Sequence, residues 1–375
     1  MLMNRRSSPG RGGLVRDLAN TVWLSTHEHD LCPAPRQLDR GGPADPARRA
    51  GQDNERHASD SIGSKVFTAR LTRKPNIRPV GGSVAVQPRY EWGMPPKLLP
   101  LVAVAAFACA LPATALAKVQ APPYYLALGD SLSVGVQPNA AGKSVPTSQG
   151  YSNDLYATAK HKIARLKLME LGCPGESTTS MIKGGPFCKY SGSQLSNAVK
   201  FIRQHRIAFI TLDIGANDVD GCATSSGING TCIANGINSI KANVPRIVNR
   251  LRKAAGRKVR IAGMTYYDPF LAEWLTGSSG QTIAQASVSL AQQINGVLAT
   301  DFKAKRFRVA DVATAFDTYV PFTTTTMMSG QTVPLAVAKV CQLTWICTPA
   351  PRGPNIHANA AGYREIATVF KQTLG

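Results

Sequence analysis

Residues 124–135 read YYLALGDSLSVG, an apolar and aromatic run that ends in a Gly-Asp turn. A run of this kind, followed at once by turn residues, is typical of a buried β-strand. Glycine permits a tight turn after the strand, so we expect Ser131 to be exposed at its carboxyl end. The segment therefore predicts the first strand of a sheet with a polar side chain at its mouth.

Strand-like and helix-like segments alternate along the rest of the chain. The other strand-like runs cover residues 166–171, 207–214, 259–264 and 307–312. Amphipathic, helix-like stretches cover residues 151–163, 194–206, 237–255, 283–303 and 360–374. This alternation predicts one α/β domain over residues 118–375, with a parallel sheet between two layers of helices. Ligands of such sheets bind beyond the carboxyl ends of the strands, where the candidate functional residues also lie.

Composition narrows the function classes. The 375 residues are 43% hydrophobic, which is ordinary for a globular protein, and the net charge is +21. The densest basic run, RIVNRLRKAAGRKVR at residues 246–260, predicts a solvated helix face. The charge also allows weak adsorption to anionic surfaces. No nucleic-acid-binding motif accompanies it, so we expect no nucleic-acid partner.

Residues 94–117 read MPPKLLPLVAVAAFACALPATALA, which has the order of a secretory signal peptide. Met94 and Lys97 precede an apolar run, and a small-x-small pattern ends at Ala117, where we expect cleavage. A membrane anchor is the alternative, but two prolines interrupt the run. A lipid on Cys109 is a further alternative, although the residues before it lack the usual leucine. The interpretation is an exported, extracellular protein.

The residues in front of this signal are unusual, because a signal peptide acts from the N-terminus. Residues 1–93 are rich in Arg, Gly, Pro, Asp and Ser and show no sustained periodicity. They would bury little apolar surface. We interpret them as an over-extended gene start, with Met94 as the initiator, or as a disordered extension.

Cysteine usage agrees with export. Six cysteines follow the signal and fall into three couples that are close in sequence: Cys173 and Cys188, Cys222 and Cys232, Cys341 and Cys347. Six cysteines allow many connectivities, and adjacent pairing is the simplest hypothesis. Disulfides would require an oxidising compartment. A metal site is the alternative, but no Cys-x-x-Cys occurs, so we predict no metal.

Three further blocks carry residue types that suit acyl transfer. A Gly-rich turn, LGCPGESTT at residues 171–179, could direct a backbone N–H at a developing oxyanion. In DIGAND, residues 213–218, the amide of Asn217 is a neutral donor suited to the same oxyanion. In GPNIHANAAGY, residues 353–363, His357 could act as the general base to a serine. Each block alone is equally compatible with an ordinary turn or helix cap.

Together, the four blocks resemble those of the SGNH hydrolases, also called the GDSL esterase/lipase family, in the same order and over nearly all of residues 124–375. The resemblance implies a flavodoxin-like, three-layer α/β/α sandwich with a five-stranded parallel sheet. It implies that Ser131 is the nucleophile and His357 the base. It further implies an oxyanion hole formed by the N–H groups of Ser131 and Gly175 and the Asn217 amide.

The same resemblance implies a secreted serine esterase or lipase that hydrolyses lipid or other acyl esters without a cofactor, and we expect a monomer. Apolar residues at 270–271, 274–275 and 320–328 could line an acyl channel or belong to the core. Two alternatives remain. One is an esterase that removes O-acetyl groups from polysaccharides, and the other is a non-catalytic binding domain that has kept the fold.

One position departs from the family pattern. The family usually has Asp three residues before the histidine, but Pro354 stands there and offers no side-chain acceptor. The imidazole would then lack its orienting carboxylate. We expect a backbone carbonyl within residues 352–354 to accept the histidine N–H, or else a remote acid, Asp268 or Asp311, to do so.

Overall fold

The computed structural model describes residues 120–186, 188, 190–224 and 227–375. The expected signal peptide at residues 94–117 and the extension at residues 1–93 lie outside the described residues. None of the helices in the described part of the chain has the length and hydrophobicity needed to cross a membrane.

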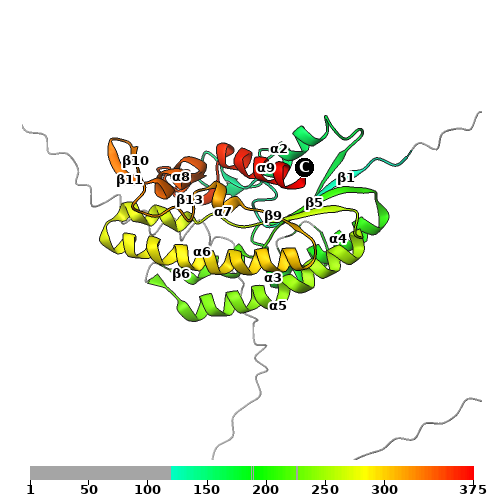
Figure 1. The fold of residues 1–375 in the computed structure, drawn as a ribbon, viewed down its shortest axis with the longest axis horizontal. Helices are drawn as coiled ribbons and strands as arrows, with labels where there is room; N and C mark the ends of the chain where they lie inside the picture. Colours follow the sequence, from blue (N-terminus) through cyan, green and yellow to red (C-terminus); the bar gives the residue numbers. More distant parts are fainter. Residues whose placement is uncertain (1–119, 187, 189, 225–226) are drawn as a thin grey trace, which may run out of the picture. The chain divides into compact units, whose positions relative to one another are not determined.

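The core of the described domain is a five-stranded, all-parallel sheet (Figure 1). In chain order its strands are β1 (Tyr124–Gly129), β4 (Lys167–Glu170), β5 (Ile207–Asp213), β8 (Arg260–Met264) and β9 (Arg308–Ala310). Their order across the sheet is β4-β1-β5-β8-β9. The second strand along the chain thus lies beside the first, followed by the third to fifth, which is the flavodoxin-like order. The predicted fold class is confirmed.

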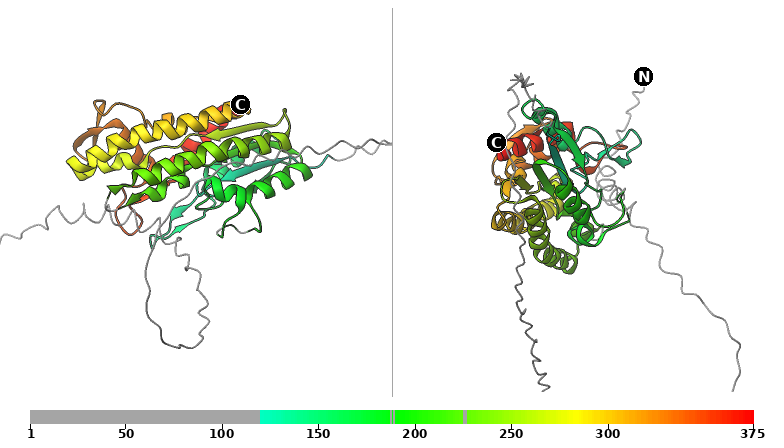
Figure 2. Two further views of the ribbon diagram at one scale, coloured as in Figure 1. Left: turned by 90° about the horizontal axis from the view of Figure 1, so that it is seen from below. Right: turned by 90° about the vertical axis from the view of Figure 1, so that its right-hand side faces the viewer.

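Helices cover both faces of the sheet (Figures 1 and 2). On one face α2 (Tyr151–Ala159) packs against α9 (Ala360–Leu374). On the other, α5 (Gly230–Ala255) contacts α3 (Thr178–Lys183), α4 (Gln194–Gln204) and α6 (Ser278–Ala304). With both faces covered, the inner strands read as continuous apolar runs. Residues 125–128 of β1 are fully buried, whereas the edge strand β4 is partly exposed.

Shorter elements decorate the carboxyl end of the sheet and were not predicted. Four two-stranded hairpins are present in the described residues: β2 (Gln137–Pro138) with β3 (Ser144–Val145), β6 (Ala223–Thr224) with β7 (Gly227–Ile228), β10 (Thr325–Met328) with β11 (Gln331–Pro334), and β12 (Thr344–Trp345) with β13 (Asn355–Ala358). Two short helices, α7 (Val312–Ala315) and α8 (Leu335–Leu343), and three 3₁₀ turns, Ala216–Asp218, Asp220–Cys222 and Pro269–Thr276, complete the domain.

The six cysteines are joined in the adjacent order. Disulfides link Cys173 to Cys188, Cys222 to Cys232 and Cys341 to Cys347. Each closes a loop near the carboxyl end of the sheet or ties such a loop to a helix. The disulfides therefore brace the segments that follow the strands rather than the strands themselves.

Packing between β8 and α6 gives a test of this architecture. A Cβ on Gly263 would lie 2.5 Å from ring atoms of Phe302, so Gly263→Ala should lower the free energy of unfolding by about 1–3 kcal/mol. Gly296 lies in α6 with open space around it, so Gly296→Ala should raise that free energy by about 0.5–1 kcal/mol. Urea unfolding of both variants checks the pair. Equal effects would contradict the packing described.

Candidate active site

The turn after β1 places Ser131 at the carboxyl end of the sheet, and the buried side chain of Asp130 shapes this turn. Asp130 Oδ1 accepts the Leu132 N–H at 2.9 Å, and Oδ2 accepts the Tyr266 hydroxyl at 2.6 Å. The Asp130 N–H in turn donates to the Asp213 backbone oxygen and to Oδ2, both at 3.1 Å. Ser131 is therefore fixed between the ends of β1 and β5.

Asp213 ends β5 and is fully buried beside Asp130. Its Oδ1 accepts a short hydrogen bond from the Tyr151 hydroxyl. Burial, followed by the neighbouring Asp130 charge, raises the pKa of Asp213 well above its usual range. Burial also raises the pKa of Asp130. This acid pair was not among the predicted site residues, because nothing local in the sequence distinguishes it from other strand-end acids.

His357 lies on β13, and its Nε2 is 3.0 Å from Ser131 Oγ. The Tyr267 hydroxyl donates to the Ile356 backbone oxygen at 2.8 Å and so fixes the strand that carries the histidine. Burial lowers the pKa of His357 to about 4. The imidazole is therefore neutral at pH 7 and can accept a proton at Nε2.

The inner ring nitrogen of His357 faces the side chain of Asn355. Nδ1 lies 2.8 Å from Asn355 Oδ1, which also accepts the His357 backbone N–H at 3.0 Å. Only the amide oxygen can accept a backbone N–H, so the amide orientation is fixed. On the other side, Asn355 Nδ2 donates to Ser144 Oγ at 2.9 Å. The Nδ1–H tautomer, with a free lone pair on Nε2, follows from this network.

The predicted orienting groups were wrong. The acceptor is neither a backbone carbonyl of residues 352–354 nor a remote acid. Asp268 Oδ1 accepts the Phe270 N–H at 2.9 Å, and its buried Oδ2 has no partner in the described residues. Asp311 caps α7 and accepts the Thr265 hydroxyl at 2.9 Å. Asn355 is two residues before His357, where an Asx-turn folds its side chain back onto the ring.

The two other predicted donors, Gly175 and Asn217, lie in adjacent loops. Asn217 Nδ2 donates to the Glu176 backbone oxygen at 3.1 Å, next to Gly175. The Gly175 loop is also joined to β1, because the Cys173 N–H donates to the Gly129 oxygen at 3.0 Å. Across the described residues, the backbone N–H groups of Ser131 and Gly175 donate to no protein acceptor. Both are therefore free to bind an oxyanion.

The Glu176 side chain fixes the Gly175 loop through hydrogen bonds. Its buried carboxylate accepts Gln194 Nε2 at 2.9 Å and a short hydrogen bond from Ser180 Oγ. Gln194 also binds both backbone groups of Gly129, at 2.7 and 2.8 Å. Burial raises the pKa of Glu176. The Gln194 amide thus ties the Gly175 loop to the end of β1.

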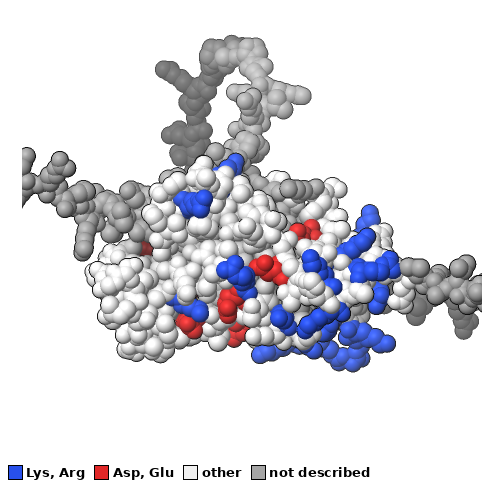
Figure 3. All heavy atoms as spheres, turned by 90° about the horizontal axis from the view of Figure 1, so that it is seen from above, with Lys and Arg blue, Asp and Glu red and all other residues white. Residues whose placement is uncertain are grey.

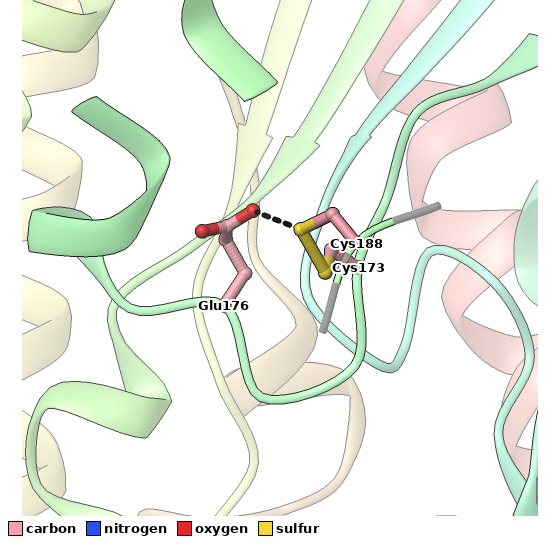
Figure 4. Close-up of side chains that lie close together, drawn as sticks. All are labelled: Cys173, Glu176 and Cys188. Atoms are coloured by element: carbon pink, nitrogen blue, oxygen red, sulfur yellow. Dashed lines mark hydrogen bonds between the residues drawn. A yellow bond between two sulfur atoms is a disulfide. The ribbon is translucent and has the colours of Figure 1, made fainter. Parts of the chain in front are cut away.

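The disulfide Cys173–Cys188 closes the Gly175 loop on its other side (Figure 4). Cys188 Sγ lies 3.4 Å from Glu176 Oε2, and a ligand atom of each of the three residues lies within 4.8 Å of the others. This is the grouping of a potential metal site. Both sulfurs are consumed in the disulfide, however, so they are not available as thiolate ligands.

A cavity of about 100 Å³ opens beside Ser131 and His357. Its walls are mainly apolar and come from the loops after β1, β5 and β8 and from α6, including Leu132, Val219, Tyr266, Phe270, Leu290, Ala291 and Ile294. Asp220 also lines it, and burial, with the charges of Asp130 and Asp218, raises the pKa of Asp220 to about 7.

The apolar residues expected to line an acyl channel contribute little to this cavity. Phe270 lines it, but Leu271 is fully buried in the core. Trp274 stacks on Phe322 with ring centroids 4.7 Å apart, and Met327 is exposed. The cavity instead uses α6, whose contribution the sequence did not indicate.

Comparison with known proteins gives independent evidence on the family of this chain. Residues 127–365 match the GDSL-like lipase/acylhydrolase family. No curated protein sequence matches the chain.

Solved structures with a similar arrangement are distant in sequence. A phospholipase A1 from Streptomyces albidoflavus is 18% identical, covering 68% of this chain and 100% of its own, with a TM-score of 0.45. An extracellular lipase from Streptomyces rimosus is also 18% identical, covering 67% and 99%, with a TM-score of 0.44. An acetylxylan esterase from Geobacillus stearothermophilus is 15% identical, covering 69% and 96%, with a TM-score of 0.40.

The family match extends from β1 to α9 and includes all four sequence blocks, three of which contribute residues to the cavity wall. The matched residues include Ser131 and His357, which are joined by the hydrogen bond described above. The chain therefore belongs to the GDSL-like lipase/acylhydrolase family.

Proposed function

We propose that this protein is a secreted carboxylic ester hydrolase that forms an acyl-enzyme on Ser131. One observation carries the proposal: Ser131 Oγ lies 3.0 Å from His357 Nε2 at the edge of an apolar cavity. A serine is a weak nucleophile unless an adjacent base takes its proton. A base with a free Nε2 lone pair at this distance meets that requirement.

In the acylation step, His357 Nε2 takes the proton from Ser131 Oγ as this oxygen bonds to the ester carbonyl carbon. The positive charge that forms on the imidazole is held by the Nδ1–H hydrogen bond to Asn355 Oδ1. Collapse of the tetrahedral intermediate breaks the bond to the alcohol oxygen, which receives the same proton. Water then attacks the acyl-enzyme with His357 again as the base, and the acid product leaves.

The oxyanion of each tetrahedral intermediate is assigned to three donors. These are the backbone N–H groups of Ser131 and Gly175 and the side-chain amide of Asn217. The hydrogen bond of Asn217 Nδ2 to the Glu176 oxygen, at 3.1 Å, leaves its second amide hydrogen available. Donors that are fixed before the reaction stabilise the developing charge without reorganisation.

The apolar cavity favours an ester with a longer acyl chain over an acetyl ester as substrate. Its walls offer Leu132, Leu290 and Ile294 to an acyl chain, and an acetyl group would leave much of this surface unused. Removal of O-acetyl groups from polysaccharides is therefore the second candidate, distinguished by chain-length preference.

Export is supported by the three disulfides, which require an oxidising compartment to form and persist. The signal peptide proposed for residues 94–117 would supply the route.

The first test compares hydrolysis of p-nitrophenyl esters by the wild type and by Ser131→Ala. Loss of the nucleophile should reduce kcat/KM by at least about 10⁴-fold. Ser148→Ala, an exposed serine in a loop, is the matched control and should retain full activity. Equal rates for wild type and Ser131→Ala would favour a non-catalytic binding domain instead.

The second test addresses the acyl group. Wild-type kcat/KM should rise from acetyl to longer esters, by up to about fourfold per added methylene while the cavity fills. Ala291→Trp should reduce octanoyl hydrolysis at least about tenfold and spare acetyl hydrolysis, because it narrows the cavity. Ala286→Trp, on an exposed position of α6, is the control. A wild type that prefers acetyl esters would support the polysaccharide esterase.

The third test concerns Asn355. Asn355→Ala removes the Nδ1 acceptor and should lower kcat about 10²-fold. In the wild type, neutral His357 should persist until the pH falls to about 4, so protonation of this base should lower kcat/KM only near that pH. Asn355→Asp retains an acceptor and adds a negative charge, which favours the imidazolium and raises the pKa of His357.

The acid limb of the Asn355→Asp profile should therefore move to higher pH. Other titrating groups of the cavity, such as Asp220, contribute to both pH profiles, so their contribution cancels when the two profiles are compared. An unchanged acid limb would show that Asn355 does not contact the base in solution.

The fourth test concerns the oxyanion donor. Asn217→Ala should lower kcat by about 10²–10³-fold with a smaller change in KM. Asn217→Asp keeps the shape of the side chain but turns a donor into an anion, so it should be at least as damaging. If Asn217→Asp retained wild-type kcat, the assignment of this donor would fail.

A further inference from the structure

Basic side chains gather at the amino end of the sheet, opposite the candidate active site. Five segments lie there: residues 160–167 before and at the start of β4, 203–206 before β5, 250–260 before and at the start of β8, 303–308 before and at the start of β9, and 371–375 at the end of α9. Each contains Lys or Arg, and none contains Asp or Glu. We call these segments the basic end. Figure 3 shows Lys and Arg concentrated on one side of the molecule.

Part of this basic end is explained by the fold itself. The helices end here, and their last carbonyl groups attract cations. Arg252 donates to the backbone oxygens of Gly256, Val259, Lys305 and Arg306, and Arg260 and Arg308 donate to those at the end of α9. These arginines therefore have a structural role.

Other cations of the basic end are not engaged in this way. Lys162, Lys258 and Lys303 are exposed, and no hydrogen bond joins their side chains to another described residue. The predicted solvated face at residues 246–260 fits this description, because Arg250 and Lys253 are exposed on α5 while Leu251 is buried. Exposed charges that bind none of the described residues remain free to bind a partner.

Three segments at the opposite end of the sheet carry no basic side chains, although Lys143, Lys183 and Arg352 lie in other segments there. Residues 213–230, 264–278 and 311–335 follow β5, β8 and β9, and they contain no Lys or Arg. Residues of the first two of these segments line the cavity beside Ser131. In the left part of Figure 3, away from the basic end, Lys and Arg are more scattered than on the right. Cations are thus denser at the basic end than in the loops that line the cavity.

The basic end extends in two dimensions. Its segments belong to strands from β4 at one edge of the sheet to β9 at the other. Its cations also come from both helical layers, with Lys160 and Lys371 near the ends of α2 and α9 and Lys253 and Lys303 on α5 and α6. A planar array of anions can contact all of these cations simultaneously, whereas an extended anionic polymer would contact only those along one line across the surface.

We propose that the basic end adsorbs to an anionic lipid bilayer and holds the cavity mouth away from that bilayer. The large apolar side chains that are exposed in the described part of the chain, Ile228, Leu275 and Met327, belong to segments at the opposite end, so adsorption is electrostatic and needs no insertion. Each Lys or Arg near an anionic surface contributes about 1 kcal/mol to binding. The enzyme would then remain active while bound and act on esters that arrive from solution.

The test measures sedimentation of the full chain with vesicles of equal parts phosphatidylglycerol and phosphatidylcholine. Binding should be strong at low salt, weak at about 0.5 M salt because of screening, and absent with phosphatidylcholine alone. The triple variant Lys162→Glu, Lys258→Glu, Lys303→Glu should bind at least about 100-fold more weakly. The control triple variant Lys183→Glu, Lys241→Glu, Arg246→Glu makes the same charge change outside the basic end and should lose much less.

Equal losses for the two triple variants would overturn the proposal, because net charge and not this surface would then govern adsorption. Retained binding by both would overturn it as well. Tighter binding to soluble polyphosphate than to the vesicles would identify a polymer as the partner and exclude the bilayer.

Orientation is tested separately, without reference to catalysis. Hydrogen exchange should slow at residues 160–167 and 257–260 when vesicles are added, and residues 264–278 should be unaffected. Hydrolysis of a soluble ester should continue at the free-enzyme rate when the protein is bound. Protection of residues 264–278 would show that the cavity mouth faces the bilayer and would overturn the orientation.

Discussion

The joint between the carboxyl ends of β1 and β5 is the constraint on which the rest of the site depends. The Asp130 N–H bonds to Asp213, and tyrosine hydroxyls from α2 and from the loop after β8 cap the two carboxyl groups. Two acids can share so small a buried space because burial raises the pKa of both, because the Asp130 charge raises that of Asp213 further, and because hydroxyl groups donate to them. Strand order makes this joint the switch point of the sheet, where crevices form.

From this joint the candidate catalytic groups are positioned by short connections. Ser131 follows Asp130 directly, and the Gly175 loop is clamped to Gly129 by Gln194 and by the Cys173 N–H. His357 lies on a separate hairpin near the C-terminus. A hydrogen bond from Tyr267 joins this hairpin to the loop after β8. A neutral amide orients it, so the imidazole keeps its tautomer without a carboxylate to stabilise the imidazolium. The low pKa of His357 agrees with this, since burial is its cause.

The direction of the strands also separates two kinds of surface. All helices that cross between parallel strands end near the amino end of the sheet, so their carbonyl groups collect cations there. The loops at the other end carry the cavity and fewer cations. The fold therefore gives the molecule a basic side and a reactive side, and the proposed adsorption uses the first without obstructing the second.

The sequence by itself determined the five strands to within one or two residues, the layers of helices, and the four blocks, because apolar runs and turn residues are local signals. It did not reveal that Asn355 orients His357, because an Asn that forms an Asx-turn cannot be told in sequence from any other Asn near a strand. It did not pair Asp130 with Asp213, 83 residues away, or bring α6 to the cavity wall. Those contacts join segments that are distant in the chain, so only the packing of the helices on the sheet decided them.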